Sequence, residues 1–567
     1  MSLSQLIAVA RGTAPADLIL ARATIVNTLS GELERGNIAI WRDRIAGVGD
    51  YERGREVIDL QGQFVVPGFI DGHVHTESSM LHIAGYAEAV VPRGVTGIVT
   101  DLHEVANVMG VAGVRYVLDA ARSLPLDLYL MAPSCVPATH LETAGARLTA
   151  EDIREILAWN ETAGLGEMMN YPGVLAGDAQ VLAELDAARH TVIDGHAPGL
   201  SGKDLNAYLA CGIRSDHEST TYHEAQEKLR RGMYVMIREG SSEKNLATLL
   251  PLVTDQTYKR CLFVVDDRSC SDLLRDGDID AVVRKAIQLG LEPVRAIQLA
   301  TINTAEYLGV RDVGAIAPGY RANLAVLSDL RELRAELVVH HGRLVARAGQ
   351  PLFTPSHDAP SALRHTMHIQ PFPVDRLALA ADTWHHPVIE IVPHQIITRS
   401  VRIAPRVNAG RIEADTERDL LKLVVVERHT ASGNIGLGLV HGLGLRRGAI
   451  ASSVAHDSHN IVAAGVNDPD LYVAIRELER LGGGLVAVDA GQVISALPLP
   501  LAGLLSDQPL RDVVPQFEAV ERAAASLGSP LPAPFATLSF LALPVIPELR
   551  LTDRGLVDVR QFKLLAS

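Results

Sequence analysis

Eight short apolar runs alternate with stretches of helical pattern between about residues 61 and 309, and nearly all of them carry His, Asp or Glu at the carboxyl end. Strand–helix alternation predicts a parallel sheet, and eight such units within about 250 residues predict a (β/α)8 barrel. In that fold the reactive side chains lie at the carboxyl ends of the strands. The runs are FIDGHVH, TGIVTDLHE, LDLYLMAPS, GLGEMMN, TVIDGHA, GIRSDHE, YVMIREG and LFVVDD.

Other segments flank this central region. Residues 1–60 and 310–350 contain short runs of alternating apolar residues, and we expect them to pair into one small β-sandwich. Residues 351–380, rich in Pro, His and Ser, are interpreted as a linker, and 381–567 as a third unit. The predicted fold class is therefore α/β, with a catalytic (β/α)8 barrel over 61–309, a flanking β-sandwich and a C-terminal α+β domain.

Composition narrows the possible partners and the location. Lys and Arg number 52 against 67 Asp and Glu, which gives a net charge of −15 and argues against binding to nucleic acid or to an anionic membrane. The N-terminal segment lacks the basic start of a signal peptide, and the apolar stretches are too short to span a bilayer. The four cysteines show no metal-finger spacing, so we expect a reduced, cytoplasmic protein.

The strongest local signal for chemistry is the pair His73 and His75 in the first predicted strand. Residues two apart in a strand point to the same face, so both imidazoles can bind one metal ion. Two histidines at this spacing also occur by chance as surface residues. The interpretation as a metal site therefore depends on what stands at the other strand ends.

Four more candidate ligand positions follow later strands. Glu167 ends the fourth strand, His196 the fifth, His217 the sixth, and either Asp266 or Asp267 the eighth. Each alone could be a core or a solvated residue. Together with the first-strand pair they offer four imidazoles and two carboxylates, which suits two divalent metal ions with one bridging carboxylate. Without cysteine in this set, we expect the site to accept Mn(II), Fe(II) or Zn(II).

A pair of divalent ions has a definite chemical use. It lowers the pKa of a bridging water to near neutrality, so that hydroxide becomes available as a nucleophile. An Asp at the end of the eighth strand can take the proton of that water and pass it to a leaving group. The predicted reaction class is hydrolysis at an sp2 carbon, in an amide, a cyclic amide or an amidine-like C–NH2 group.

Longer stretches resemble one family of the amidohydrolase superfamily, the bacterial adenine deaminases. The matching words include PGFIDGHVHTESSML, TDLHEVANVMG, GHAPGLSGKDLNAYLACGIRSDHEST, VVDDR and ASSVAHDSHNIVAAGVND, and they span roughly residues 65 to 470. The resemblance implies conversion of adenine and water to hypoxanthine and ammonia, as in purine salvage, by a metal-bridging hydroxide that attacks C6. It also implies a binuclear Mn or Fe centre and a small purine substrate. We further expect a homodimer or a larger homo-oligomer.

The resemblance also assigns roles to the candidate residues. His73 and His75 become first-strand ligands, Glu167 the bridging carboxylate, and His196 and His217 further ligands. The eighth-strand acid is the proton shuttle. We prefer Asp266 to Asp267 for it, because the superfamily acid follows the apolar strand directly.

The second predicted strand ends in a further polar group. Asp101 and His103 could form a second metal position or support the ligands from behind, or they could be a helix-capping acid and a surface histidine. Glu104 could accept or donate a hydrogen bond at a purine ring nitrogen, or it could be an acid favoured by the helix dipole.

Two further sets are candidates for substrate binding. Arg238, Ser241 and Ser242 follow the seventh strand and could line a purine pocket. In the third unit, a dense polar cluster stands in an otherwise apolar segment. It could be a self-satisfied turn, or it could close over the barrel mouth and recognise the purine edge. Its members are His456, Asp457, His459 and Asn460, of which the first three are the candidates for substrate binding.

One departure from the family pattern leaves the substrate open. The family places a His after the eighth-strand DDR, whereas this chain has Ser269. An N6-substituted adenine or a related aminated heterocycle is therefore an alternative substrate. A cyclic amidase of the hydantoinase or dihydroorotase kind is another reading, but those enzymes bridge their metals with a lysine where this chain has Glu167. A non-catalytic scaffold is disfavoured because every expected ligand position is filled.

Overall fold

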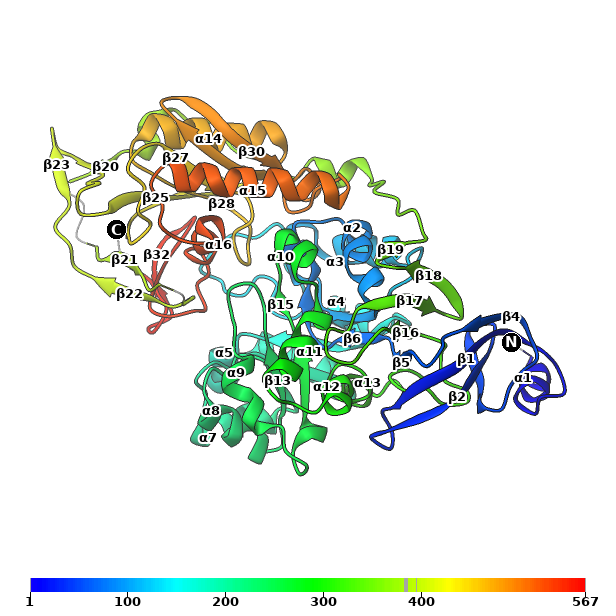
Figure 1. Cartoon of the computed structure of the whole chain (residues 1–567). Coiled ribbons are helices and arrows are strands. Elements are labelled where there is room, and N and C mark those ends of the chain that lie inside the picture. The colour runs from blue at the N-terminus through cyan, green and yellow to red at the C-terminus, as the bar shows by residue number, and fades with distance from the viewer. Residues whose placement is uncertain (1, 382–385, 394, 566–567) are drawn as a thin grey trace.

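A computed structural model describes residues 2–381, 386–393 and 395–565 (Figure 1). The N-terminal strands lie at one end of the molecule, the alternating strands and helices in the middle, and the C-terminal strands and helices at the other side. No helix within the described ranges combines the length and the apolar character needed to cross a membrane.

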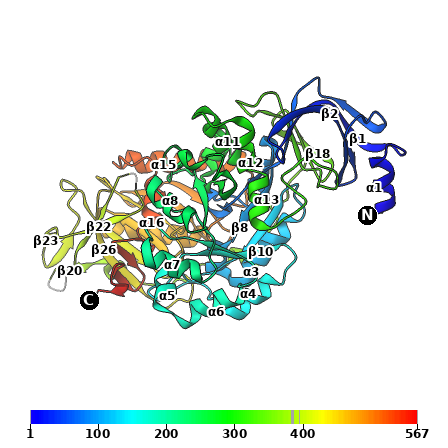
Figure 2. The same cartoon turned by 90° about the horizontal axis from the view of Figure 1, so that it is seen from below.

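The two β-rich segments that flank the central region belong to one sheet. Within the described residues, nine strands pair into this sheet, and β5 joins its two halves by running antiparallel to β16. We expected a sandwich; the structure instead has one sheet that curves into an arch (Figure 2). The strands are β1 (Ala16–Asn27), β2 (Glu32–Trp41), β3 (Arg44–Gly49), β4 (Gly54–Asp59), β5 (Phe64–Pro67), β16 (Leu324–Leu327), β17 (Ala335–His340), β18 (Arg343–Arg347) and β19 (Gln350–Pro351).

Alternation of apolar side chains explains why this single sheet is stable. Leu18 and Leu20 of β1 point to one face and join the apolar cluster inside the arch. Ile19 points to the opposite face, where it packs with Val9 of α1 (Leu3–Ala10). Because side chains alternate along a strand, both faces of β1 are buried against different neighbours.

All eight predicted runs of the central region form strands, and they run parallel to one another. The first strand is β6 (Phe69–Asp71) continued by β7 (Val74–His75), and the last is β14 (Cys261–Val264) continued by β15 (Asp266–Asp267). Between them lie β8 (Val95–Thr100), β9 (Asp127–Ala132), β10 (Thr162–Met168), β11 (Val192–Gly195), β12 (Ser215–Asp216) and β13 (Tyr234–Arg238).

The ladders between these strands form three groups. One ladder runs from β6 through β8, β9 and β10 to β11, a second joins β12, β13 and β14, and a third pairs β15 with β7. Among the described residues, no ladder joins β11 to β12. Instead the Arg214 amide donates to the Ile193 carbonyl at 3.1 Å. The predicted closed ring is therefore not continuous in its backbone hydrogen bonds.

Helices separate the central strands along the chain and cover the outside of the strands. They are α2 (Ile83–Val90), α3 (His103–Ala121), α4 (Ala150–Leu157), α5 (Tyr171–Ala176), α6 (Ala179–Ala187), α7 (Gly202–Ala210), α8 (Tyr222–Arg230), α9 (Leu246–Leu249), α10 (Cys270–Arg275), α11 (Ile279–Gln288), α12 (Pro293–Leu299) and α13 (Ile302–Leu308). Local sequence fixes several helix starts. Thr149 and Asp152, for example, form a capping box at α4, in which each side chain bonds the other residue's backbone amide.

The segment interpreted as a linker has little regular structure but is packed. Leu363 and Leu377 are buried, and Ile369 and Phe372 join an apolar cluster of the C-terminal unit. This packing follows from its apolar residues, which the high Pro, His and Ser content masks in the sequence.

The C-terminal unit is built round a mixed sheet of eight strands within the described residues. Its order is β22-β21-β26-β25-β28-β27-β29-β30. The strands are β21 (Val388–Ile391), β22 (Thr398–Val401), β25 (Leu420–Val426), β26 (Ile435–His441), β27 (Ala449–Ser452), β28 (Ile461–Gly465), β29 (Gly484–Asp489) and β30 (Gln492–Pro498). Short outer strands complete the unit: β20 (Leu379–Ala380), β23 (Arg406–Asn408), β24 (Arg411–Glu413), β31 (Leu549–Thr552), β32 (Gly555–Asp558) and β33 (Lys563–Leu564).

Helices cover both faces of this sheet. On one face α14 (Asp468–Leu481) buries Leu471, Ile475 and Leu478 against the strands. On the other side α15 (Leu510–Ser526) packs against α10 and α2 of the central unit, and α16 (Pro534–Phe540) packs on β27 and β28. The C-terminal unit therefore lies against the part of the central unit where the strand ends carry their polar residues (Figure 1).

Candidate metal centre

The first and last central strands bring the first-strand histidines to the eighth-strand acids. In the parallel pair β7–β15, Asp266 lies opposite Val74 and Asp267 opposite His75. The Asp266 amide also donates to the His73 carbonyl at 3.0 Å. Residues almost two hundred positions apart therefore share one strand end, as expected where the first and last strands of such a fold are neighbours.

The two histidines face each other across a very short gap. Nε2 of His73 lies 3.2 Å from Nε2 of His75, and both side chains are buried. Oδ1 of Asp266 lies 3.2 Å from Nε2 of His75 and 3.6 Å from Nε2 of His73. Two imidazole nitrogens and one carboxylate oxygen thus converge on one point, an arrangement suited to a cation between them.

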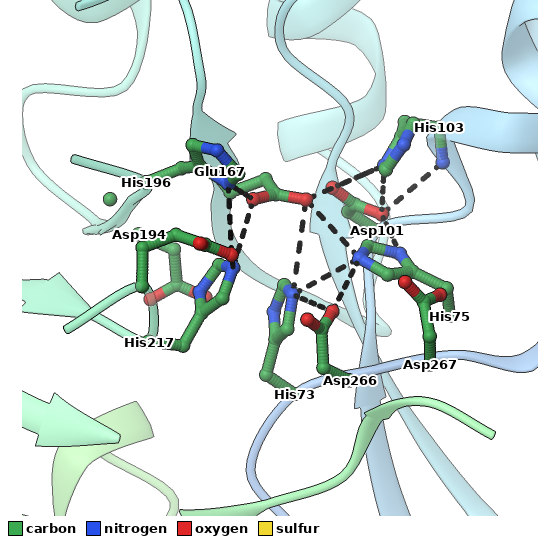
Figure 3. A network of polar contacts seen from close by, with 12 residues as sticks. His73, His75, Asp101, His103, Glu167, Asp194, His196, His217, Asp266 and Asp267 are labelled. Carbon is green, nitrogen blue, oxygen red and sulfur yellow. Dashed lines mark hydrogen bonds and ion pairs between the residues drawn. The ribbon is translucent and has the colours of Figure 1, made fainter. Parts of the chain in front are cut away.

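Glu167 lies between two groups of histidines (Figure 3). Its Oε1 is 3.2 Å from Nε2 of His75, on the side of the first-strand histidines. Its Oε2 is 2.7 Å from Nδ1 of His196 and 3.2 Å from Nε2 of His217. Each carboxylate oxygen therefore serves a different histidine group, which is the geometry that a bridging carboxylate requires.

Asp101 and His103 extend the cluster from the end of β8. Nδ1 of His103 lies 3.0 Å from Oδ1 of Asp101, and the same oxygen lies 3.4 Å from Nδ1 of His75. Nδ1 of His103 is also 3.9 Å from Oε1 of Glu167. Because Asp101 engages the far nitrogen of His75, it can hold that ring with Nε2 turned to the centre, as acids behind metal-binding histidines do.

Burial and mutual attraction set the protonation of this cluster. Burial raises the pKa of the Glu167 carboxyl, but His196 and His217 outweigh burial and hold it well below its usual range. Burial and the repulsion of His217 and His75 lower the pKa of His73 to about 3. Glu167 is therefore charged and His73 is neutral near pH 7, the states in which these groups bind metal. Burial lowers the pKa of His217, but Glu167 and Asp266 outweigh burial and raise it to about 9, so a bound ion would have to displace a proton from that ring. A donor set of nitrogen and oxygen without sulfur fits Mn(II), Fe(II) or Zn(II).

Glu218 and Arg238 also belong to this cluster, in positions that the sequence did not predict. Glu218, which directly follows His217, lies with Oε1 3.4 Å from Nε2 of that histidine. Arg238 was predicted in the purine pocket; the structure buries it between Glu218 and Asp266, with Nη1 2.6 Å from Oδ2 of Asp266. The adjacency of Glu218 to a predicted ligand in the word SDHE is the signal that could have indicated it.

The polar cluster of the C-terminal unit meets the central unit at Glu104. The two carboxylate oxygens of Glu104 pair with Nδ1 of His456 and with Nε2 of His459. Burial lowers the pKa of His456, but the attraction of Glu104 outweighs it and raises the pKa to about 9. Asp457 lies behind them, 3.8 Å from Nε2 of His103. These contacts agree with the predicted position of this unit over the strand ends. Glu104, which was a candidate to bond a purine ring nitrogen, is paired with two histidines in the structure.

A cavity of about 670 Å³ opens between the two units beside these residues. Asp267 and His456 lie on its inner wall, and Ser241 and Ser242 line it from the loop after β13. The ring of Phe540, also on the wall, stacks on His456 with the ring centroids 4.8 Å apart. Polar and charged residues as well as apolar ones line this cavity, and its volume is ample for a purine.

Comparison with known proteins assigns both halves of the chain. Residues 64–345 match the Amidohydrolase family, and residues 395–563 match the Adenine deaminase C-terminal domain. The adenine deaminase of Dehalococcoides mccartyi is 59% identical over 564 residues, covering 100% of this chain and 99% of that protein. The chain belongs to the adenine deaminase family. The family resemblance read from the sequence motifs is thus confirmed, and with it an amidohydrolase fold extended by a C-terminal domain.

More distant members of the family keep the same length. Adenine deaminase 2 of Carboxydothermus hydrogenoformans is 50% identical and covers 99% of both chains. The adenine deaminase of Methanothrix thermoacetophila is 47% identical over 572 residues, with 99% of both chains covered. The central and C-terminal units of this chain are therefore parts of one family architecture.

Proposed function

We propose that this protein catalyses the hydrolytic deamination of adenine to hypoxanthine and ammonia. The observation that carries the proposal is the position of Glu167, with one carboxylate oxygen on each histidine group and Asp266 beside the first group. The names of full-length relatives at 59% and 60% identity support adenine as the substrate.

Two divalent metal ions are the proposed cofactors, with Mn(II) or Fe(II) preferred and Zn(II) possible. His73, His75 and Asp266 would hold one ion, His196 and His217 the other, and Glu167 would bridge them, with Asp101 and His103 behind or beside the first. When bound, such a pair lowers the pKa of a water molecule and so supplies hydroxide near neutral pH.

Asp266 is the proposed proton shuttle. Its Oδ1 faces the histidines, while Arg238 holds its Oδ2 at 2.6 Å and fixes the carboxylate plane. Burial raises the pKa of Asp266, but Arg238 and the histidines outweigh burial and keep it well below its usual range. The ionised Asp266 can take a proton from the attacking water and deliver it to the amino nitrogen. One C–O bond then forms and one C–N bond breaks at C6, ammonia leaves, and the second proton of the water ends on N1 of hypoxanthine.

The cavity of about 670 Å³ beside Asp267 and His456 is the proposed purine seat. Phe540 offers an aromatic surface for the purine ring. Ser241 and Ser242 also line the cavity, and their hydroxyls donate to Asp272 and Glu243. His456, which is paired with Glu104, lies on the cavity wall, so the C-terminal unit would exclude water from the reacting carbon.

The finer architecture is part of the same proposal. We take the eight central strands as a (β/α)8 barrel over 61–309, flanked by one β unit from 1–60 and 310–350. Residues 351–380 and 381–567 then form the connection and the C-terminal domain. The cytoplasmic location and the homodimeric or larger assembly stay predictions from the sequence; light scattering of the purified protein measures the assembly.

A direct assay tests the activity. Protein produced with added Mn(II) should consume adenine, followed by its ultraviolet absorbance, and release one ammonia for each adenine lost. Metal-loaded protein that releases no ammonia from adenine contradicts the proposal. Treatment with a chelator should remove the activity, and Mn(II) should restore it.

Ser269 supports one alternative substrate class. It stands where the family pattern has His, caps α10 with its hydroxyl and lines the cavity. A smaller side chain at the cavity wall leaves room for a substituent on N6. Comparison of kcat/KM for adenine and N6-methyladenine decides between the two, since a higher value for the methylated base would favour the alternative.

A further inference from the structure

A second cluster of metal-binding side chains lies at the opposite end of β9 from the candidate metal centre. Asp127 begins β9, and His340 and His341 stand at the end of β17 and in the turn that follows. Oδ1 of Asp127 lies 3.1 Å from Nε2 of His340 and 3.0 Å from Nε2 of His341. The two imidazole rings stack with their centroids 4.0 Å apart.

We propose that Asp127, His340 and His341 bind one divalent transition-metal ion, preferably Zn(II). The set consists of two imidazole nitrogens and one carboxylate oxygen, the donors that Zn(II) takes in three-ligand sites. Tetrahedral bonds of about 2.0 to 2.1 Å place neighbouring ligand atoms about 3.3 Å apart. The observed separations of 3.0 and 3.1 Å are close to that spacing.

The neighbours of Asp127 hold one of its oxygens and leave the other to the histidines. Oδ2 accepts from Nδ2 of Asn323 at 2.9 Å and from Nη1 of Arg321 at 3.2 Å. Arg321 also pairs with Asp312, whose Oδ2 lies 3.1 Å from Nε of Arg321. The positive charge of Arg321 is therefore divided between two carboxylates and does not fully neutralise Asp127. Carboxylates that bind metal are commonly fixed by such hydrogen bonds from behind.

The histidine turn is held in an uncommon conformation. His341 has a φ of 47°, in the left-handed region that a non-glycine residue rarely occupies. Its amide donates to Oδ1 of Asn323 at 2.9 Å, so the same asparagine anchors both the turn and Asp127. A strained residue held by its surroundings, with its ring stacked on the adjacent ring, points to a role for that ring.

The nitrogen of His341 is free to take a ligand. Among the described residues, Nε2 of His341 finds no hydrogen-bond partner, although Oδ1 of Asp127 lies 3.0 Å away. Nε2 of His340 faces the same Oδ1 of Asp127, so the two nitrogens and that oxygen turn toward one point. The three side chains stand on the wall of a cavity of about 1290 Å³, which leaves space for a fourth ligand such as water. The ion would clamp the β17–β18 turn to the first residue of β9.

Total metal content tests the site independently of the proposed activity. The active protein, loaded with Mn(II), is equilibrated with micromolar free Zn(II), passed through a desalting column, and all transition metals are counted per chain by mass spectrometry. Because all transition-metal ions are counted together, replacement of Mn(II) by Zn(II) at the candidate metal centre does not change the total. The wild-type protein should hold one ion more than His341→Asn, a substitution that keeps a residue tolerant of positive φ.

His223→Asn is the matched control, because His223 is an exposed histidine on α8. It should keep the wild-type metal count. His340→Ala should lose the same single ion as His341→Asn, and adenine turnover should stay within twofold of wild type in His341→Asn. Equal metal content in wild type and His341→Asn overturns the site, whatever the result of the adenine assay.

Discussion

Glu104, buried in the first turn of α3, forms an ion pair with the largely buried His456, which lies 352 positions later in the C-terminal unit. The second oxygen of Glu104 pairs with His459. The amide of Ala455 donates to Nδ1 of His459 at 3.1 Å, so the proton of that ring is on Nε2, facing Glu104. One carboxylate thus fixes the C-terminal unit over the strand ends of the central unit.

This pair should couple the two units energetically. Removal of one member of a buried charge pair leaves the other uncompensated, so Glu104→Gln and His456→Gln should each lower the thermal midpoint and kcat/KM. The double variant should be less damaged than the sum of the singles, with a coupling of about 1–3 kcal/mol from a double-mutant cycle on kcat/KM. Strictly additive effects would show that the two side chains act separately.

Glu167→Gln should lose metal as well as activity. The amide keeps the shape of the side chain but removes the charge that both histidine groups share. Mass spectrometry should find fewer than the about two ions per chain expected of a binuclear centre. Glu184→Gln is the control, because Glu184 is a buried acid on α6 whose Oε1 accepts from Gln180. Full metal content in Glu167→Gln would exclude a bridging role.

Asp266→Asn should separate chemistry from metal binding. Loss of a positioned acid–base group typically reduces turnover by about 10²–10⁴-fold. The histidines and Glu167 remain, so both metal ions should stay bound, and adenine turnover should fall within that range. Asp267→Asn is the variant for comparison, since Asp267 is bonded to the Ser78 hydroxyl and lines the proposed purine seat, so we expect it to change KM more than kcat. A larger loss in Asp267→Asn would transfer the shuttle role to that residue.

The sequence identified the residues at the strand ends but not the contacts between segments that are far apart in the chain. His73 and Glu167 were predictable because each follows an apolar run, and parallel strands place such residues at one edge. Arg238 also follows a strand, yet its contact with Asp266 depends on side-chain directions that no pattern encodes. The pairing of Glu104 with His456 depends on how two units pack. The sheet is a single arch rather than a sandwich because β5 pairs with β16. Short runs of alternating apolar residues do not determine which strands pair with each other.

Glu521 on α15 provides a test of stability against pH. Its side chain is half-buried on the wall of the 670 Å³ cavity, and its Oε2 has no hydrogen-bond partner among the described residues. Burial raises the pKa of this carboxyl to about 8. An acid with a raised pKa in the folded state contributes stability at low pH, and this stability is lost as the pH rises from the unfolded value through about 8.

Glu521→Gln should therefore raise the thermal midpoint more at pH 9 than at pH 5. We expect a gain of roughly 1 kcal/mol at pH 9 after allowance for partial exposure, which corresponds to about 1–2 °C in a chain of this size. Differential scanning calorimetry at the two pH values measures it. Glu518→Gln is the control, because Glu518 is an exposed acid one turn earlier on the same helix. A shift in Glu521→Gln that does not grow with pH would mean that the carboxylate reaches solvent when it ionises.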